Sequence, residues 1–184
     1  MRHLLPLTLL IANCFIADGQ TSTGTKTGSS TRTPDQIFLR QAAQGNLAEI
    51  QLGELAQKNG SSQVVKQFGQ RMVTDHTNLI DKVKSLASSK GFTLPISPSA
   101  KDQATYRTLA SKTGSDFDKA YITDMINDHT HDINDFEQES NSGADPDIRA
   151  LASQALPTLQ VHLRQAENAA QQLGISTNPS GPGQ

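Results

Sequence analysis

Apolar residues recur at intervals of three and four along most of the chain, which is the spacing of one face of an α-helix. Serine, threonine or aspartate precedes most of these segments and glycine follows them, as helix caps do. The pattern predicts a short helix near residues 98–112 and four long helices, at about 34–59, 62–90, 115–141 and 145–173. No alternating pattern of useful length predicts a β-strand.

The connections between these helices decide the topology. Only a few residues separate the first two long helices, and the same holds for the last two, so each pair is expected to form an antiparallel hairpin. Residues 92–114 join the hairpins and can reach roughly 50 Å, more than the ~40 Å length of a long helix. Such a crossover makes the second and third long helices parallel. The predicted fold class is therefore all-α, a ferritin-like four-helix bundle.

Each predicted long helix has one ionisable residue near the middle of its otherwise apolar stripe. These residues are Glu49, His76, His129 and His162. Burying an ionisable group is costly unless a partner compensates, so four at similar heights indicate that they satisfy one another, directly or through an ion. One carboxylate and three imidazoles could bind copper, zinc, iron or manganese. The alternative is a structural network in which Glu49 accepts hydrogen bonds from the histidines and water fills the rest.

A short repeat relates the second and third long helices. Residues 68–80 match residues 121–133 at an aromatic residue, a methionine and an Asp-His-Thr tripeptide, with a constant offset. A pseudo-two-fold axis along the bundle could relate the two motifs. Met72 and Met125 each precede a histidine by about one turn, so two thioethers and two imidazoles could hold Cu(I). The alternative is that these methionines only fill core space.

Acidic residues flank the histidines on the same helices. Asp75 and Asp128 each precede a histidine and lie about 100° around the helix from it, so we expect them to be second-sphere acceptors rather than core ligands. The third long helix also has an acidic ridge with His131 beside it. A solvated face is the expected role of this ridge, and a loosely held divalent cation is the alternative. The ridge consists of Asp124, Asp128, Asp132, Asp135 and Glu139.

The two ends of the chain differ in composition from the helical part. Residues 1–19 combine a basic start with an apolar run too short to span a bilayer, which predicts a secretory signal peptide. The alternative is a lipoprotein signal ending at Cys14, because the preceding residues are close to a lipobox. Residues 20–32 and 176–184 are rich in small polar residues and predict a disordered linker and tail. The folded domain is then 33–175.

Charge and motifs exclude several classes of protein. Sixteen basic and 18 acidic residues give a net charge of −2, which argues against nucleic-acid binding through a broad basic face. A single cysteine cannot form a thiolate zinc site or a CxxC redox pair. The motifs GxSxG, GxxxxGK[ST], GxGxxG, HExxH and ExxH are absent. An enzyme, such as a metal-dependent oxidase or a catalase-like protein, is therefore a minor alternative.

Four segments together resemble an exported bacterial family, the domain of unknown function 4142 (DUF4142). They are FLRQAAQGNLAEIQLGELA (38–56), FGQRMVTDHTNLIDKVKSLA (68–87), FDKAYITDMINDHT (117–130) and LPTLQVHLRQAENA (156–169). The resemblance covers about 35–173 and implies a ferritin-like bundle, often associated with the outer membrane. The motif positions of the family fall on the same glutamate and three histidines. No activity comes with the family name.

Taken together, these features predict an exported helical bundle in the periplasm, with outer-membrane association or secretion as alternatives. Its interior Glu/His site is expected to bind a transition metal, in a role connected with stress protection. The competing hypothesis is a non-catalytic structural or interaction bundle at the cell envelope. In that case a protein partner binds the surface and the polar network only fixes the packing.

Overall fold

The structure is a computed structural model, and it describes residues 32–176. Its helices are α1 (Pro34–Asn59), α2 (Gln63–Ser89), α3 (Ala100–Ala110), α4 (Gly114–Ser142) and α5 (Pro146–Gln172). Every predicted helix is present, with bounds close to those expected, and the described part of the chain contains no β-strand. The predicted signal peptide, linker and tail lie outside the described residues, apart from Arg32 and Ser176.

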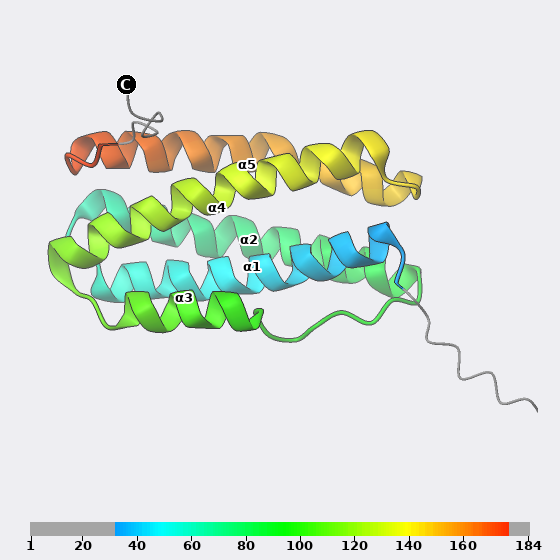
Figure 1. Cartoon of the computed structure of the whole chain (residues 1–184), viewed down its shortest axis with the longest axis horizontal. Coiled ribbons are helices and arrows are strands. Elements are labelled where there is room, and N and C mark those ends of the chain that lie inside the picture. The colour runs from blue at the N-terminus through cyan, green and yellow to red at the C-terminus, as the bar shows by residue number, and fades with distance from the viewer. Residues whose placement is uncertain (1–31, 177–184) are drawn as a thin grey trace, which may run out of the picture. The chain divides into compact units, whose positions relative to one another are not determined.

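The helices form two antiparallel hairpins, α1 with α2 and α4 with α5 (Figure 1). Contacts between α1 and α4 and between α2 and α5 join the hairpins. Helices α2 and α4 run in the same direction, and the crossover between them carries α3 along α1 and α4 (Figure 1). The predicted all-α, ferritin-like bundle is therefore confirmed. None of the described helices has the length and apolar character needed to span a membrane.

A buried aspartate near the start of α4 fixes the turn between α1 and α2. Asp118 accepts hydrogen bonds from the backbone N–H of Ser61 at 2.9 Å and of Ser62 at 2.8 Å. It also accepts one from the Ser61 hydroxyl at 2.6 Å. The N–H groups at the start of a helix have no acceptor within the helix. The Asp118 carboxylate, which comes from α4, supplies an acceptor at the start of α2. Asp118 thereby fixes the end of the first hairpin to the second.

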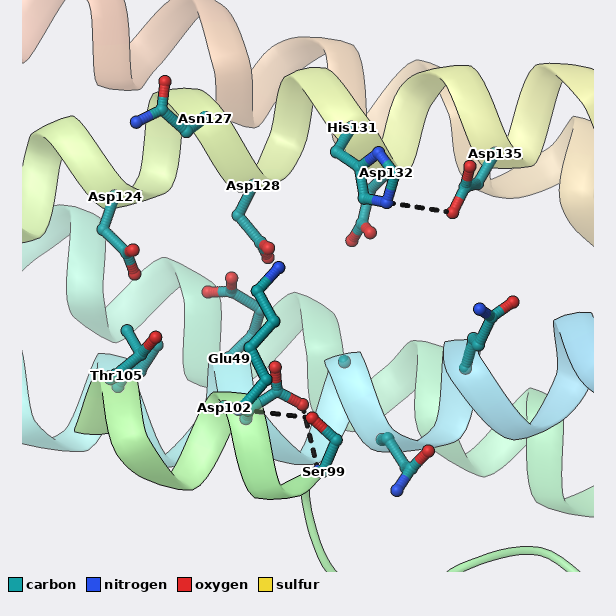
Figure 2. Close-up of a pocket in the computed structure, with 16 residues that line it drawn as sticks. Glu49, Ser99, Asp102, Thr105, Asp124, Asn127, Asp128, His131, Asp132 and Asp135 are labelled. Atoms are coloured by element: carbon teal, nitrogen blue, oxygen red, sulfur yellow. Dashed lines mark hydrogen bonds and ion pairs between the residues drawn. The ribbon is translucent and has the colours of Figure 1, made fainter. Parts of the chain in front are cut away.

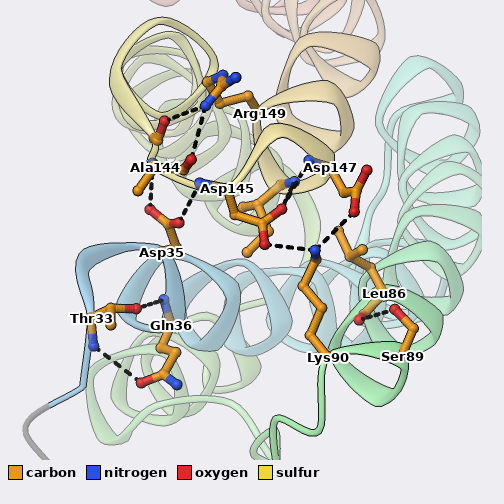
Figure 3. A network of polar contacts seen from close by, with 12 residues as sticks. Thr33, Asp35, Gln36, Leu86, Ser89, Lys90, Ala144, Asp145, Asp147 and Arg149 are labelled. Atoms are coloured by element: carbon orange, nitrogen blue, oxygen red, sulfur yellow. Dashed lines mark hydrogen bonds and ion pairs between the residues drawn. The ribbon is translucent and has the colours of Figure 1, made fainter.

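A second aspartate, Asp35, fixes the turn between α4 and α5 at the opposite end of the bundle. Asp35, in the first turn of α1, accepts hydrogen bonds from the backbone N–H of Ala144 at 3.0 Å and of Asp145 at 2.7 Å (Figure 3). Beside it, Nζ of Lys90 lies 2.6 Å from Asp145 and 2.8 Å from Asp147. The turn between α4 and α5 is therefore fixed by α1 and by the residue that caps the end of α2.

A layer of buried polar residues divides the apolar core into two clusters. One cluster contains Leu39 and Phe136, and the other contains Phe117 and Tyr121. On each long helix the polar positions fall between the residues of the two clusters, near the middle of the bundle. The layer consists of Asn46 and Glu49 on α1, His76 on α2, His129 on α4 and His162 on α5.

Two glycines allow α1 and α2 to approach closely. A Cβ atom at Gly53 would lie 2.5 Å from the carbonyl oxygen of Gly69, and a Cβ at Gly69 would lie 2.7 Å from that of Gly53. Both positions are buried within helices, where a larger residue would otherwise be favoured. The contact between the backbones brings the polar positions of α1 and α2 near each other.

Candidate metal centre

Three histidines from three helices meet in the polar layer. His76, His129 and His162 are at most 2% exposed, and one ring nitrogen from each lies within 4.8 Å of the others. The distance between His129 Nε2 and His162 Nδ1 is 3.3 Å. Two metal–nitrogen bonds of about 2.0 Å at a tetrahedral angle give nearly the same separation. The spacing of these two rings therefore suits a shared metal ion.

The other nitrogen of each of these two rings faces a group that only accepts hydrogen bonds. His129 Nδ1 lies 3.0 Å from the carbonyl oxygen of Met125, and His162 Nε2 lies 2.8 Å from Asp75 Oδ2. Each ring must therefore carry its proton on that outer nitrogen and donate it. A neutral imidazole has a single N–H, so the two facing nitrogens both present lone pairs. No proton lies between them to make the 3.3 Å contact a hydrogen bond.

His76 is oriented by Asn46. The amide nitrogen of Asn46 donates to the carbonyl oxygen of Ala42 at 2.6 Å, so the amide oxygen faces His76 Nδ1, at 3.0 Å. His76 Nδ1 therefore carries the proton. His76 Nε2 is left with a lone pair and has no hydrogen-bond partner among the described residues. Three lone pairs thus converge, each fixed by an outer acceptor, as in metal sites with second-sphere support.

Burial keeps these imidazoles neutral. It lowers the pKa of His76 well below its ordinary value, and the neighbouring His129 and His162 lower it further. Burial, followed by the proximity of His162, lowers the pKa of His129 to about 4. Burial also lowers the pKa of His162, although Asp75 opposes this. At neutral pH, protons would therefore compete only weakly with a metal ion for these nitrogens.

Asp75 connects the histidine group to the protein surface. Its Oδ2 accepts hydrogen bonds from His162 and, at 2.9 Å, from Nε of Arg71. Partial burial acts to raise the pKa of Asp75, but the hydrogen bonds from His162 and Arg71 outweigh it and hold the pKa below its ordinary value. Asp75 is therefore an ionised carboxylate that accepts the hydrogen bond of His162 Nε2.

Glu49 lies in the same layer but not in the histidine group. Its carboxylate is not among the ligand atoms within 4.8 Å of one another. It lines a pocket of about 380 Å³ bounded by α1, α3 and α4, and Asp128 lines the same pocket (Figure 2). The expectation that Glu49 accepts hydrogen bonds from the histidines is wrong, because Asn46 holds the place beside His76.

The two methionines of the repeat are completely buried. Met72 and Met125 belong to the apolar cluster that borders the histidines, about one helical turn away from His76 and His129. The backbone carbonyl of Met125 also orients His129. Their positions are compatible with thioether ligands and equally with packing of the core.

Two residues that support the site, Asn46 and Arg71, were not predicted from the sequence. Asn46 precedes Glu49 by three positions, and residues three apart share a helix face. A second polar residue on the buried face of α1 was therefore a detectable signal. Arg71 precedes Asp75 by four positions, which is the spacing of an ion pair along a helix.

The comparisons with known proteins agree with this fold. Residues 20–169 match the family described as "Domain of unknown function (DUF4142)". The chain belongs to the DUF4142 family. None of the curated proteins matches this DUF4142 chain.

Several solved structures share the fold of this DUF4142 protein. A DUF305 protein from Streptomyces coelicolor, described as secreted, is 10% identical with a TM-score of 0.67, over 79% of this chain and 96% of that one. A DUF305 fragment from Deinococcus radiodurans is 15% identical with a TM-score of 0.66, over 77% and 97%. CopM in the Cu(I)-bound form is 17% identical with a TM-score of 0.63, over 77% and 98%. At these identities the likeness shows the fold alone.

Proposed function

We propose that this DUF4142 protein binds a transition-metal ion, Cu(I), through His76, His129 and His162. The observation that carries the proposal is the convergence of three unprotonated ring nitrogens whose outer N–H groups are already directed to acceptors. Without an ion, the lone pairs of His129 and His162 repel each other at 3.3 Å. An ion bound by all three rings would remove that repulsion.

The surroundings of the rings favour Cu(I) over zinc, iron or manganese. Imidazole suits several of these metals, but Met72 and Met125, one helical turn before His76 and His129 and buried with them, offer soft thioether donors, which select Cu(I). The rings are buried, so little water is present to complete a larger coordination sphere. The shared fold with CopM in its Cu(I)-bound form supports the same choice.

Binding, rather than catalysis, suits the burial of this site. The three imidazoles are shielded by two apolar clusters, and a substrate would need direct access to the ion for turnover. Export to the periplasm belongs to the same proposal. The signal-like residues 1–19 support it, as does the description of the DUF305 protein as secreted. The protein would then hold copper outside the cytoplasm and limit its reactivity under metal stress.

The test is an anaerobic Cu(I) titration of the untagged protein against a chromogenic chelator. We expect about one Cu(I) per chain, and at least tenfold weaker binding in His129→Gln. His131→Gln is the matched control, because His131 lies on the same helix with its side chain 67% exposed. Less than about 0.1 Cu(I) per chain, or equal binding by His129→Gln, would show that the histidines only form a packing network. Tighter binding of Zn²⁺ than of Cu(I) would overturn the choice of metal.

A further inference from the structure

Glu49 is the most unusual buried group outside the histidine site. It is 1% exposed, and no described residue donates a hydrogen bond to its carboxylate oxygens, whose close neighbour is another acid, Asp128. A buried carboxylate without a partner is strongly destabilising when ionised. The side chain faces the pocket between α1, α3 and α4 (Figure 2). A ligand in that pocket could therefore supply the missing contacts.

The pocket is lined mainly by carboxylates. Asp124, Asp128 and Asp132 extend from α4 towards Glu49 on α1 (Figure 2). Other charged groups of the pocket already have partners. His131 lies 3.5 Å from Asp135, and Asp102 accepts a hydrogen bond from the backbone of Ser99 at the start of α3. Lys101 also lines the pocket, and one lysine cannot balance the four remaining carboxylates.

The proximity of these carboxylates opposes their ionisation. Burial raises the pKa of Glu49 well above its ordinary value, and the nearby charge of Asp128, with the contact between the two carboxyl groups, raises it further. Burial and Asp128 also raise the pKa of Asp124 to about 6, although Lys101 acts in the opposite direction. The pocket is thus electrostatically unfavourable when deprotonated, and a cation would relieve it.

The internal repeat allows the surroundings of Asp128 to be compared with those of Asp75. Asp128 occupies the position in α4 that Asp75 occupies in α2. Asp75 faces a hydrogen-bond donor, His162 of α5, whereas Asp128 faces another acid, Glu49 of α1. In the α2 motif, the ring N–H of His162 compensates the charge of Asp75. In the α4 motif, only an added proton or cation can compensate the charges of Asp128 and Glu49.

We propose that this pocket binds a hard divalent cation, such as Ca²⁺ or Mn²⁺, with Glu49 and Asp128 as direct ligands. Asp124 and Asp132, one turn to either side of Asp128, would bind the water ligands of the ion. Carboxylate oxygens are the donors that such ions prefer, whereas the histidine group suits a soft ion. A volume of about 380 Å³ leaves room for an ion that keeps several water ligands. Lys101 would be displaced from the carboxylates when the ion binds. The protein then has two metal sites with different ion preferences.

Terbium luminescence tests the proposal on the full chain. Tb³⁺ replaces Ca²⁺ at oxygen sites and emits when a nearby aromatic side chain is excited. The chain has no tryptophan and only two tyrosines, Tyr106 and Tyr121. Tyr121 precedes Asp124, which lines the pocket, by three positions on α4, so its ring is about one helical turn from the pocket and can act as the donor. We expect saturable emission with one Tb³⁺ per chain, reversed by excess Ca²⁺.

Variants decide whether the signal comes from this pocket. Glu49→Gln and Asp128→Asn should each weaken Tb³⁺ binding at least tenfold, while Glu137→Gln, an exposed acid of α4, should bind as the wild type does. Ca²⁺ should raise the melting temperature of the wild type and leave that of Glu49→Gln unchanged. Absence of saturable binding, or equal affinity in Glu49→Gln, would overturn the proposal.

Different variants test the two metal proposals independently. His129→Gln should lose Cu(I) and keep Tb³⁺, and Glu49→Gln should do the reverse. Loss of both ions in a single folded variant would show that the pocket and the histidines form one site, which contradicts the separation proposed here. Circular dichroism of each variant at the titration temperature establishes that it is folded.

Discussion

Asp75 and His162 lie on different helices and share a hydrogen bond of 2.8 Å. The contact fixes the proton of His162 on Nε2, so Nδ1 points towards His129 with its lone pair free. Arg71 holds the same carboxylate oxygen from the surface side. A residue outside the histidine group thus decides which nitrogen of His162 faces the other rings.

Asp75→Ala should weaken Cu(I) binding by about 10- to 100-fold, the usual cost of losing a second-sphere partner of a histidine ligand. The internal repeat supplies the control. Asp128→Ala removes the equivalent aspartate of α4, which hydrogen-bonds none of the three histidines, and should change Cu(I) affinity less than threefold. Chelator competition measures both. Similar losses in the two variants would mean that general negative charge, rather than the contact with His162, matters.

The fold was predictable because its signals are local. Thr33 and Gln36 form a capping box at the predicted start of the first helix, with the backbone N–H of Gln36 donating to the Thr33 hydroxyl (Figure 3). Short turns then force hairpins, and a crossover long enough to run the length of the bundle leaves few alternatives. Burial of the three histidines was predictable for the same reason, since helical periodicity identifies the buried face.

The surroundings of Glu49 were not predictable in the same way. Periodicity identifies the buried side of the helix. The direction in which the Glu49 side chain points within that side depends on how α1 is rotated against its neighbours. The close contact at Gly53 and Gly69 and the cover provided by α3 decide that rotation and that environment. Both are tertiary contacts between distant parts of the sequence. Four of the five acids of the ridge, all except Glu139, consequently line a pocket rather than lying on an open face.

The unfolding free energy of the metal-free protein should contain a histidine contribution that is lost as the pH falls from 6.5 towards 4. His129 has a pKa of about 4 when folded, against 6.5 for an ordinary histidine, so the unfolded chain takes up the proton first. The stabilisation by neutral His129 is complete above pH 6.5 and disappears below its folded pKa. Over this window we expect a loss of about 3 kcal/mol from this residue.

The comparison with His129→Gln isolates that contribution. Glu49 and Asp124 have raised pKa values, so they take up protons first in the folded state and act in the opposite direction as the pH falls. Both proteins retain these carboxylates, and the difference between them reports the histidine. Urea unfolding at several pH values should give a smaller pH dependence for the variant. Parallel curves would contradict a buried neutral His129.

Asp118→Ala should lower the unfolding free energy by about 2–3 kcal/mol. The variant leaves the backbone N–H groups of Ser61 and Ser62 without their carboxylate acceptor and releases the turn between α1 and α2 from α4. Asp116→Ala, an exposed position on the same helix, is the control and should change stability by less than about 0.5 kcal/mol. Chemical denaturation measures both. An equally small change in Asp118→Ala would show that water replaces the carboxylate.

Two glycines of α1 should respond in opposite directions to the same substitution. Gly45→Ala places its Cβ where no atom lies within 4 Å, so the higher helix propensity of alanine should stabilise the protein by about 0.5–1 kcal/mol. Gly53→Ala introduces the same methyl group 2.5 Å from the carbonyl oxygen of Gly69. Helices α1 and α2 must then separate, and we expect a loss of about 1–3 kcal/mol. Because the propensity gain is common to both variants, the difference in their melting temperatures measures the cost of separating the helices.

Gly53→Ala should also weaken Cu(I) binding, since Asn46 of α1 orients His76 of α2 across this same contact. A stabilised Gly53→Ala variant would mean that the close approach of the two backbones is not required.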